Sequence, residues 1–250
     1  MVKQITPEGL LISYLLLLVV LGISYFERLK LEKDILISFV RMSIQLFAAG
    51  FALSYIFAWD KTILNMLIYI AMIYFASRIV VKRSGVDFSH LTGHIFVSIL
   101  LSSFFVLTVM LFGVVGLKSL NARYFIVLAG MIVGNSMNST TIGIERFFSS
   151  YKENKGKVED LLSLGATEEE ALRFIGRSAL KASILPSLAS ASGMGIVFLP
   201  GMMTGQILSG VNPNQAVFYQ ISIVVAITTT VCLSNYFMIK TLTKMWRKFN

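Results

Sequence analysis

Charged residues are scarce in this 250-residue sequence, at 14% of the chain against 56% for hydrophobic residues. A soluble domain of this length is rarely so apolar. Apolar stretches of about 18 or more residues, each long enough for a helix to cross the hydrocarbon core of a bilayer, recur along the chain. We expect about seven membrane-spanning helices, at 9–26, 35–58, 62–80, 91–113, 124–144, 183–205 and 215–239. The predicted fold is an all-α, polytopic helix bundle in the cell membrane.

Cysteine is almost absent, since Cys232 is the only one. One cysteine forms no internal disulfide and no multi-cysteine metal site within the chain. The sequence also has no Walker glycine-lysine motif, no H-E-x-x-H motif, no G-x-S-G motif and no paired intramembrane aspartates. These absences argue against an intramembrane enzyme, and they mean that any ATP hydrolysis must come from another protein. We therefore expect no catalytic residue and no cofactor bound by this chain.

Metal-binding side chains are few as well. Every aspartate and glutamate falls in a predicted loop or at the edge of a predicted span, which leaves no carboxylate cage for a hard cation within the membrane. The only histidines, His90 and His94, are four residues apart near the start of the fourth predicted span. That spacing can chelate a metal, but without a third ligand the pair is a weak candidate. The metal site stays unknown at this point.

Acidic residues are fewer than basic ones, 13 against 22, and the formal net charge is +9. Most lysines and arginines follow the first, third, fifth and last predicted spans, including the segment 145–181. The positive-inside rule then places the N-terminus outside the cell and the C-terminus in the cytoplasm. The charge is explained by this topology and by contact with anionic membrane lipid, so no nucleic-acid partner is needed.

The segment 145–181 is the only long loop, and we expect it to form two short amphipathic helices on the cytoplasmic face. The first should end at Gly165, because glycine readily adopts the left-handed conformation that closes a helix. The second should open at Thr167 as N-cap, with Glu170 three residues on completing a capping box. Two interpretations stay open here: a surface that docks on a partner, or a solvated linker between two spans.

The stretch "GNSMNSTT" at 134–141 places amides and hydroxyls inside an apolar run. Unpaired polar groups are costly in hydrocarbon, so these side chains should face other helices, a partner subunit or a water-filled path. Two hypotheses remain, a substrate gate and polar contacts that hold helices together. The residues that we expect along a substrate pathway in this stretch are Asn135, Ser136, Asn138 and Thr141.

Three more polar residues are candidates for the pathway. Arg41 and Gln45 are one helical turn apart in the second predicted span and share a face. Arg41 either extends toward the membrane edge or faces the pathway, where it would contact an anionic substrate. Pro200-Gly201 should break or kink the sixth span, and Gln206 follows this break. Alternatively, the span simply ends there on the outer side, with a turn before Gln206, and this explains Pro200-Gly201 equally well.

Three motifs resemble known transport proteins. The stretch "LSLGATEEEAL" (162–172) is similar to the coupling loop of ABC transporter permeases, although the EAA triplet of importers is missing before its glycine. Together with "GMIVGNSMNSTTIGIERF" (130–147) and "LPGMMTGQILSGVNPNQAVFYQI" (199–221), it resembles the FetB-like permeases over essentially the whole chain. By this resemblance, the residues that contact an ATPase are Glu159, Leu162, Leu164, Gly165, Ala166, Thr167 and Glu170.

The resemblance implies a single permease domain over 1–250 that works as a homodimer with a separate ATP-binding cassette subunit. That partner would use the ATP. Iron or another metal is the implied exported substrate, and plant relatives are linked to aluminium tolerance. The alternatives are a permease for an anionic solute such as a nucleotide sugar, a passive channel, and a scaffold protein of the membrane.

Overall fold

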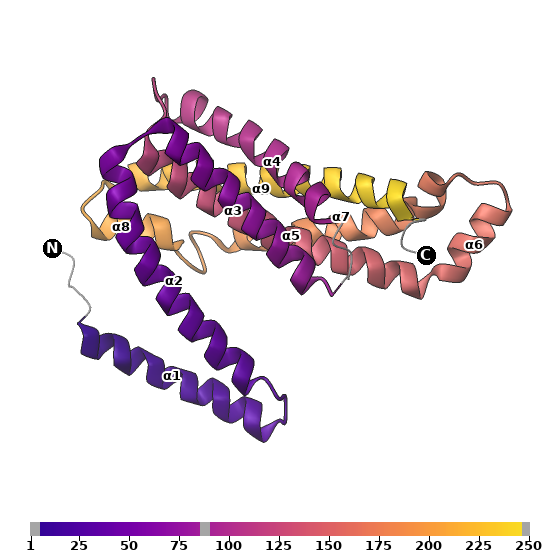
Figure 1. Cartoon of the computed structure of the whole chain (residues 1–250), viewed down its shortest axis with the longest axis horizontal. Coiled ribbons are helices and arrows are strands. Elements are labelled where there is room, and N and C mark those ends of the chain that lie inside the picture. Colours follow the sequence, from indigo (N-terminus) through magenta and orange to yellow (C-terminus); the bar gives the residue numbers. More distant parts are fainter. Residues whose placement is uncertain (1–5, 86–90, 247–250) are drawn as a thin grey trace. The chain divides into compact units, whose positions relative to one another are not determined.

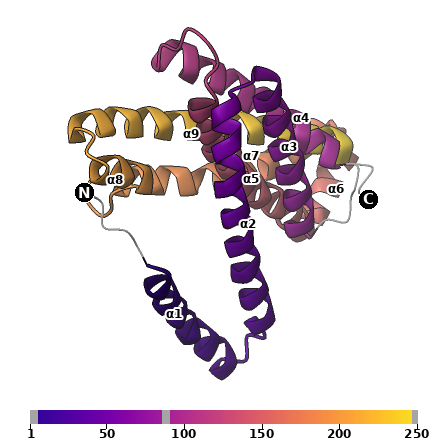
Figure 2. The same cartoon turned by 60° about the vertical axis from the view of Figure 1, so that its left-hand side comes forward.

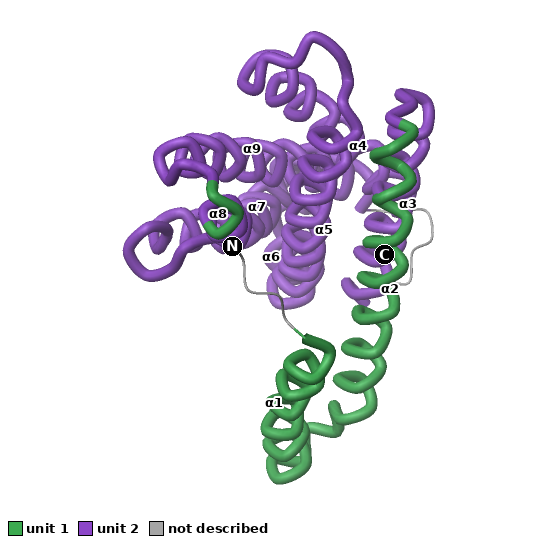
Figure 3. Tube along the Cα trace, turned by 90° about the vertical axis from the view of Figure 1, so that its left-hand side faces the viewer, with its two compact units in different colours: residues 1–59, 208–210 green, residues 60–207, 211–250 purple. Residues whose placement is uncertain are grey.

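The computed structural model describes residues 6–85 and 91–246, and every regular element in these two ranges is helical (Figure 1). This part of the chain divides into two compact units (Figure 3). The first comprises residues 1–59 and 208–210, and the second comprises residues 60–207 and 211–250. The predicted all-α membrane protein is confirmed, and each unit is described by itself below.

The first unit is a helical hairpin of α1 (Pro7–Phe26) and α2 (Glu32–Trp59). Ser24 fixes the connection, because its hydroxyl donates to Glu32 Oε1 at 2.7 Å and accepts the Leu31 amide at 3.2 Å. The two helices also share a hydrogen bond between the hydroxyls of Tyr14 and Ser43. Both helices expose many large apolar side chains, as expected for helices that face lipid or another protein.

The second unit contains the remaining helices of the described chain. They are α3 (Thr62–Arg83), α4 (Leu91–Thr108) with its π-helical extension η1 (Val109–Val114), α5 (Ala122–Glu153), α6 (Lys155–Ser163), α7 (Glu168–Gly193), α8 (Gly201–Leu208) and α9 (Pro213–Met245). Asparagine side chains begin the two longest helices: Asn121 caps α5, and Asn212 precedes Pro213 at the start of α9.

The centre of this unit is formed by α5 and α9. The first packs against α3, α7 and α9, and the second also packs against α4 and α7. The chain turns back after α8, so that α9 runs antiparallel to α7 (Figures 1 and 2). Polar contacts supplement the apolar core: the hydroxyls of Tyr69 and Ser103 lie 2.6 Å apart, and the Tyr69 ring meets the Phe125 ring edge-on. Buried hydroxyls paired in this way avoid the cost of desolvation without a partner.

Six helices of the described chain are long and apolar enough to span a membrane: α1, α2, α3, α4 with η1, α5 and α9. The sixth predicted span, 183–205, is not a continuous helix. It comprises the end of α7, an irregular turn and part of α8. The expected break at Pro200-Gly201 is present, but the irregular segment already begins after Gly193, because Gly195 adopts a left-handed φ of 81°.

The segment 145–181 also differs from the prediction of two short helices. Helix α5 continues through Glu153 before the short α6, and α7 is a 26-residue helix that extends into the predicted sixth span. Pro186 lies inside α7 and does not end the helix. The capping box of Thr167 and Glu170 is confirmed at the start of α7.

Candidate functional site

A polar cavity of about 280 Å³ lies between α5, α7 and α9. Residues from all three helices contribute to it, so it depends on the packing at the centre of the second unit. Its lining residues are Asn135, Asn138, Ser139, Ile142, Ser183, Pro186, Ser187, Ser190, Met194, Gln220, Val224, Ile227 and Thr228.

The polar groups of this cavity are uncharged. They are amides, hydroxyls and one thioether. The lining therefore offers hydrogen-bond donors and acceptors, and none of the residues in it is charged. A polar cavity of this kind within apolar helices suits a neutral or already complexed molecule better than a bare multivalent cation, since hard cations bind most strongly to carboxylates.

Gln220 is one of the residues that line the cavity, and its amide is incompletely paired. Its Oε1 is buried and has no hydrogen-bond partner among the described residues, while its Nε2 lies 4.0 Å from Met194 Sδ. A buried amide oxygen without a partner costs free energy, and it is stabilised when a donor approaches it. The Gln220 amide is therefore a strained polar group at the edge of the cavity.

A hydrogen-bonded chain of buried groups closes one side of the cavity and links its three helices. Asn235 on α9 donates from Nδ2 to Ser139 Oγ on α5 at 2.8 Å, and Ser139 donates to the Ser183 carbonyl on α7 at 2.8 Å. All three side chains are buried. Gly143 permits this approach, because a Cβ at that position would lie 2.5 Å from Asn235 Oδ1. These groups hold the helices together.

Pro186 removes one helical hydrogen bond from the part of α7 that lines the cavity. Proline has no N–H, so the carbonyl of Ala182 loses its usual helical partner one turn earlier. Ser183, Ser187 and Ser190 line the cavity around this position. The wall of α7 therefore combines serine hydroxyls with a weakened stretch of helix.

The structure brings together some of the predicted pathway residues and separates others. Asn135 and Asn138 both lie in the cavity and are exposed. Ser136 is fully buried elsewhere in the bundle, and Thr141 donates back to the Met137 carbonyl at 3.0 Å. Neither Ser136 nor Thr141 lines the cavity.

The other three predicted pathway residues also lie outside this cavity lining. Gln206 is on α8 and half-buried. Arg41 and Gln45 are exposed on α2, in the first unit. Their part in a pathway stays a prediction.

Several cavity residues were not predicted from the sequence. They are Ser139, Ser183, Ser187, Ser190, Met194, Gln220 and Thr228. Their spacing carries a signal, because Ser183, Ser187 and Ser190 recur at intervals of four and three residues, which places them on one face of a helix. The same rule relates Gln220 to Thr228, which is two turns further along α9.

The structure does not test the histidine pair as a metal site. His90 lies outside the described residues, and His94 is half-buried on α4. Within residues 6–85 and 91–246, no group of three or more His, Cys, Asp or Glu side chains is positioned to hold a metal ion.

A closed turn connects α6 to α7 at the end of the second unit. Gly165 adopts a φ of 92°, its amide donates to the Leu162 carbonyl at 3.0 Å, and the Ala166 amide donates to the Leu161 carbonyl at 3.0 Å. This pair of bonds is the Schellman motif, which the predicted glycine cap anticipated. The turn therefore has a defined shape rather than that of a flexible linker.

The side chains of this turn are mostly exposed. Leu164 is 84% exposed although it is apolar, and Thr167 and Glu170 are exposed beside it. Leu162 and Ala166 line a groove of about 750 Å³ that continues to the end of α9. On α6, Glu159 is exposed, and its Oε1 lies 3.8 Å from Lys155 Nζ.

Two polar contacts attach the start of α7 to the end of α9. Trp246 Nε1 donates to Glu168 Oε2 at 2.8 Å, and Lys240 forms an ion pair with Glu169. The hydrogen bond from Lys240 holds the pKa of the Glu169 carboxyl below its usual value. Hydrogen bonding by Thr167 lowers the pKa of Glu170 in the same way. Both carboxylates are thus stabilised in their charged form.

Comparison with known proteins matches nearly the whole chain to one family. The model of the uncharacterised protein family UPF0014 matches residues 7–246. No solved structure matches the chain.

Three relatives illustrate the range of the family. The chain is 33% identical over 232 residues to the "Probable iron export permease protein FetB" of Escherichia coli, covering 93% of this chain and 88% of the relative. It is 33% identical over 216 residues to the "UPF0014 membrane protein YjkA" of Bacillus subtilis, covering 86% and 85%. It is 31% identical over 221 residues to the "Protein ALUMINUM SENSITIVE 3" of Arabidopsis thaliana, covering 87% and 78%.

Proposed function

The chain belongs to the UPF0014 family of multi-pass membrane proteins, and from this premise we propose that it is the membrane subunit of an ATP-driven exporter of iron or another metal. One relative carries the name "Probable iron export permease protein FetB". A separate ATP-binding cassette subunit supplies the energy, since the sequence has no nucleotide-binding motif of its own.

The exposed turn between α6 and α7 is the observation that carries this proposal. Leu164 presents an apolar side chain at a rigid tip outside the predicted spans, where water would otherwise surround it. An exposed apolar residue on a defined turn is suited to insertion into a pocket of a partner. We assign the cytoplasmic side to this end, in agreement with the distribution of lysines and arginines.

The cavity between α5, α7 and α9 is the proposed part of the substrate path. Asn135, Asn138 and Gln220 supply amides there, and the serines of α7 supply hydroxyls. Because this lining is uncharged, we propose that the metal crosses as a complex with an organic or hydroxy ligand rather than as a bare ion. An anionic solute is disfavoured at this cavity, because no cation lines it.

A homodimer is part of the proposal. One chain supplies one membrane half, and an ATP-binding cassette machine needs two. The apolar, exposed faces of α1 and α2 offer surface for a second copy or for lipid. Mass measurement of the purified complex in a lipid nanodisc tests the expected ratio of two membrane chains to two ATP-binding chains.

The decisive experiment is to co-express the chain with candidate ATP-binding cassette subunits from the same organism, purify the complex and measure ATPase activity in liposomes. The panel contains ferrous iron, ferric iron, ferric citrate, other divalent metals and a nucleotide sugar. Stimulation by iron or its complex, together with ATP-dependent movement of iron across the membrane, supports the proposal. Failure of any ATP-binding protein to associate would contradict it and would favour a passive channel or a scaffold.

A further inference from the structure

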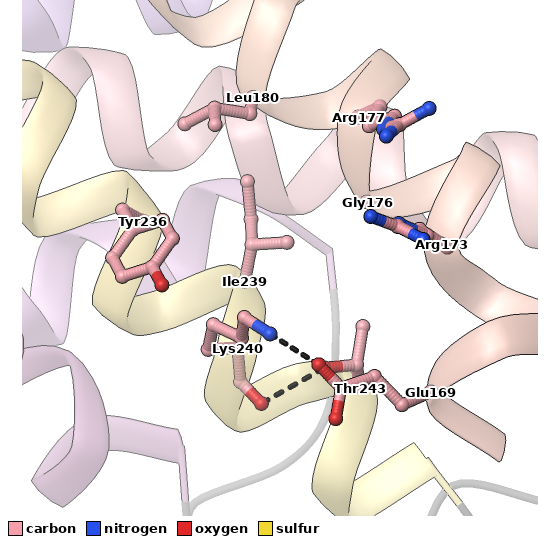
Figure 4. Close-up of a pocket in the computed structure, with 9 residues that line it drawn as sticks. All are labelled: Glu169, Arg173, Gly176, Arg177, Leu180, Tyr236, Ile239, Lys240 and Thr243. Atoms are coloured by element: carbon pink, nitrogen blue, oxygen red, sulfur yellow. Dashed lines mark hydrogen bonds and ion pairs between the residues drawn. The ribbon is translucent and has the colours of Figure 1, made fainter. Parts of the chain in front are cut away.

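A second pocket, of about 500 Å³, lies between α7 and α9 near the turn (Figure 4). Arg173 and Arg177 lie on its α7 side, and Tyr236, Ile239 and Lys240 come from α9 (Figure 4). The cavity described above shares none of these residues. This pocket is therefore a separate site within the second unit.

Positive charge dominates the pocket. Three cationic side chains line it, against the single carboxylate of Glu169. That carboxylate is already paired with Lys240. Arg173 and Arg177 are four residues apart, so their guanidinium groups project from the same face of α7. Guanidinium groups bind phosphate oxygens through paired hydrogen bonds, so this cationic lining suits an anionic phosphate group.

The inner part of the pocket is apolar and closely packed. Gly176 allows α9 to approach, since a Cβ there would lie 3.2 Å from Ile239 Cγ2. Leu180 follows the two arginines on the same face of α7, and Leu188 continues this face at 50% exposure. The exposed ring of Tyr236 lies opposite, on α9. A cationic pocket thus leads directly to an exposed apolar surface within the predicted membrane.

We propose that Arg173, Arg177 and Lys240 bind the phosphate group of an anionic phospholipid, whose acyl chains lie along the exposed face beyond Leu180. Basic pockets between helices at the cytoplasmic boundary are suited to such headgroups. The assignment to the cytoplasmic leaflet rests on the orientation proposed above. The lipid would join α7 to α9 beside the Glu169 and Lys240 pair, next to the turn.

The test uses the purified full chain, delipidated in a mild detergent. Phosphatidylglycerol and phosphatidylcholine are added separately, and retained lipid is counted by native mass spectrometry while the midpoint of thermal unfolding is followed. We expect selective retention and stabilisation by phosphatidylglycerol. The double substitution Arg173→Gln and Arg177→Gln should weaken that binding at least about tenfold, because each lost charge-assisted hydrogen bond is worth a comparable factor.

A matched control removes the same charge elsewhere. Arg78 and Lys82 are four residues apart and exposed on α3, outside this pocket. Changing both to Gln should leave phosphatidylglycerol binding within about twofold of the original. A further variant, Arg173→Lys with Arg177→Lys, should keep part of the binding, because it keeps both positive charges and loses the planar guanidinium groups.

Three outcomes would overturn the lipid assignment. The first is equal retention of phosphatidylglycerol by the glutamine double variant and the original chain. The second is equal stabilisation by soluble glycerol phosphate, which would assign the pocket to a soluble phosphate ester. The third is a glutamine double variant that binds lipid like the original chain but no longer binds the ATP-binding subunit. That result would assign the pocket to a protein contact. Because lipid binding is measured on the chain alone, a failed transport assay does not affect the result.

Discussion

Asn235 on α9 and Gly143 on α5 face each other so closely that only a hydrogen atom fits at the glycine. Asn235 in turn donates to Ser139, one turn before Gly143 on the same helix. The polar link at the centre of the bundle therefore depends on a residue without a side chain. The link also borders the cavity, because Ser139 and Ser183 line it.

Gly143→Ala should destabilise the bundle by about 1–3 kcal/mol, because the new methyl group would meet Asn235 Oδ1 at 2.5 Å and Ser183 Cβ at 3.3 Å. Gly134→Ala is the control, since a Cβ there meets nothing within 4 Å. Thermal unfolding of both variants in the same detergent measures the difference. Equal midpoints for the two variants would show that Asn235 moves aside at little cost.

Changing Asn135 and Asn138 together to Leu should abolish substrate-stimulated ATPase activity and leave assembly intact, because both amides are exposed in the cavity. Asn235→Leu should do the reverse, since it breaks the buried link to Ser139. A hydrogen bond between membrane helices is worth about 0.6 kcal/mol on average. Detergent-resistant assembly and stimulated turnover are measured on the same preparations. Loss of assembly in the Asn135 and Asn138 variant, with normal turnover per assembled complex, would make these two amides purely structural.

Gly165→Val should uncouple the proposed ATPase from transport, because valine at a φ of 92° is strained and the cap that shapes the turn would be lost. The local cost is about 1–2 kcal/mol, and insertion into the membrane should be unaffected. Gly156→Ala in α6 serves as the control, because a Cβ there is unobstructed. Normal binding of the ATP-binding subunit and normal transport by Gly165→Val would refute the coupling assignment.

Acidification should loosen the contact between α7 and α9. The pKa of Glu169 is lowered in the folded protein, so its contribution to stability is fully present above the usual carboxyl pKa and is lost as the pH falls through the lowered value. Unfolding midpoints of the original chain and of Glu169→Gln are compared from neutral to acidic pH. The difference between the two should shrink as the pH falls. A constant difference across the range would show that the ion pair with Lys240 contributes nothing to stability.

The sequence predicts local features of this fold, such as helix caps, better than features that depend on tertiary packing. The caps at Gly165 and Thr167 were predictable, because turn and cap chemistry depends on residues a few positions apart. The length of α7 was not, because the apolar run after residue 183 looked like a separate span, and the helix simply continues through Pro186. Tertiary packing decides whether a proline ends a helix or remains inside it.

The polar stretch of α5 shows the same limit at the candidate site. Its composition correctly indicated a polar region, but not which of its residues face the cavity. Asn135 and Asn138 do so, whereas Ser136 and Thr141 lie on other faces of the helix. The helical period gives the relative directions of these side chains, and only the positions of α7 and α9 determine which direction is the cavity.

The continuity of α7 has a mechanical consequence. Thr167 at the turn and Ser187 at the cavity are joined by unbroken helix, a separation of roughly 30 Å along its axis. A helix transmits axial displacement and rotation with little loss, and the only proline within α7, Pro186, lies at the cavity end. Displacement of the turn therefore cannot be absorbed on the way. The turn and the α7 wall of the cavity are therefore parts of one continuous helix, so that a shift of the first should carry the second with it.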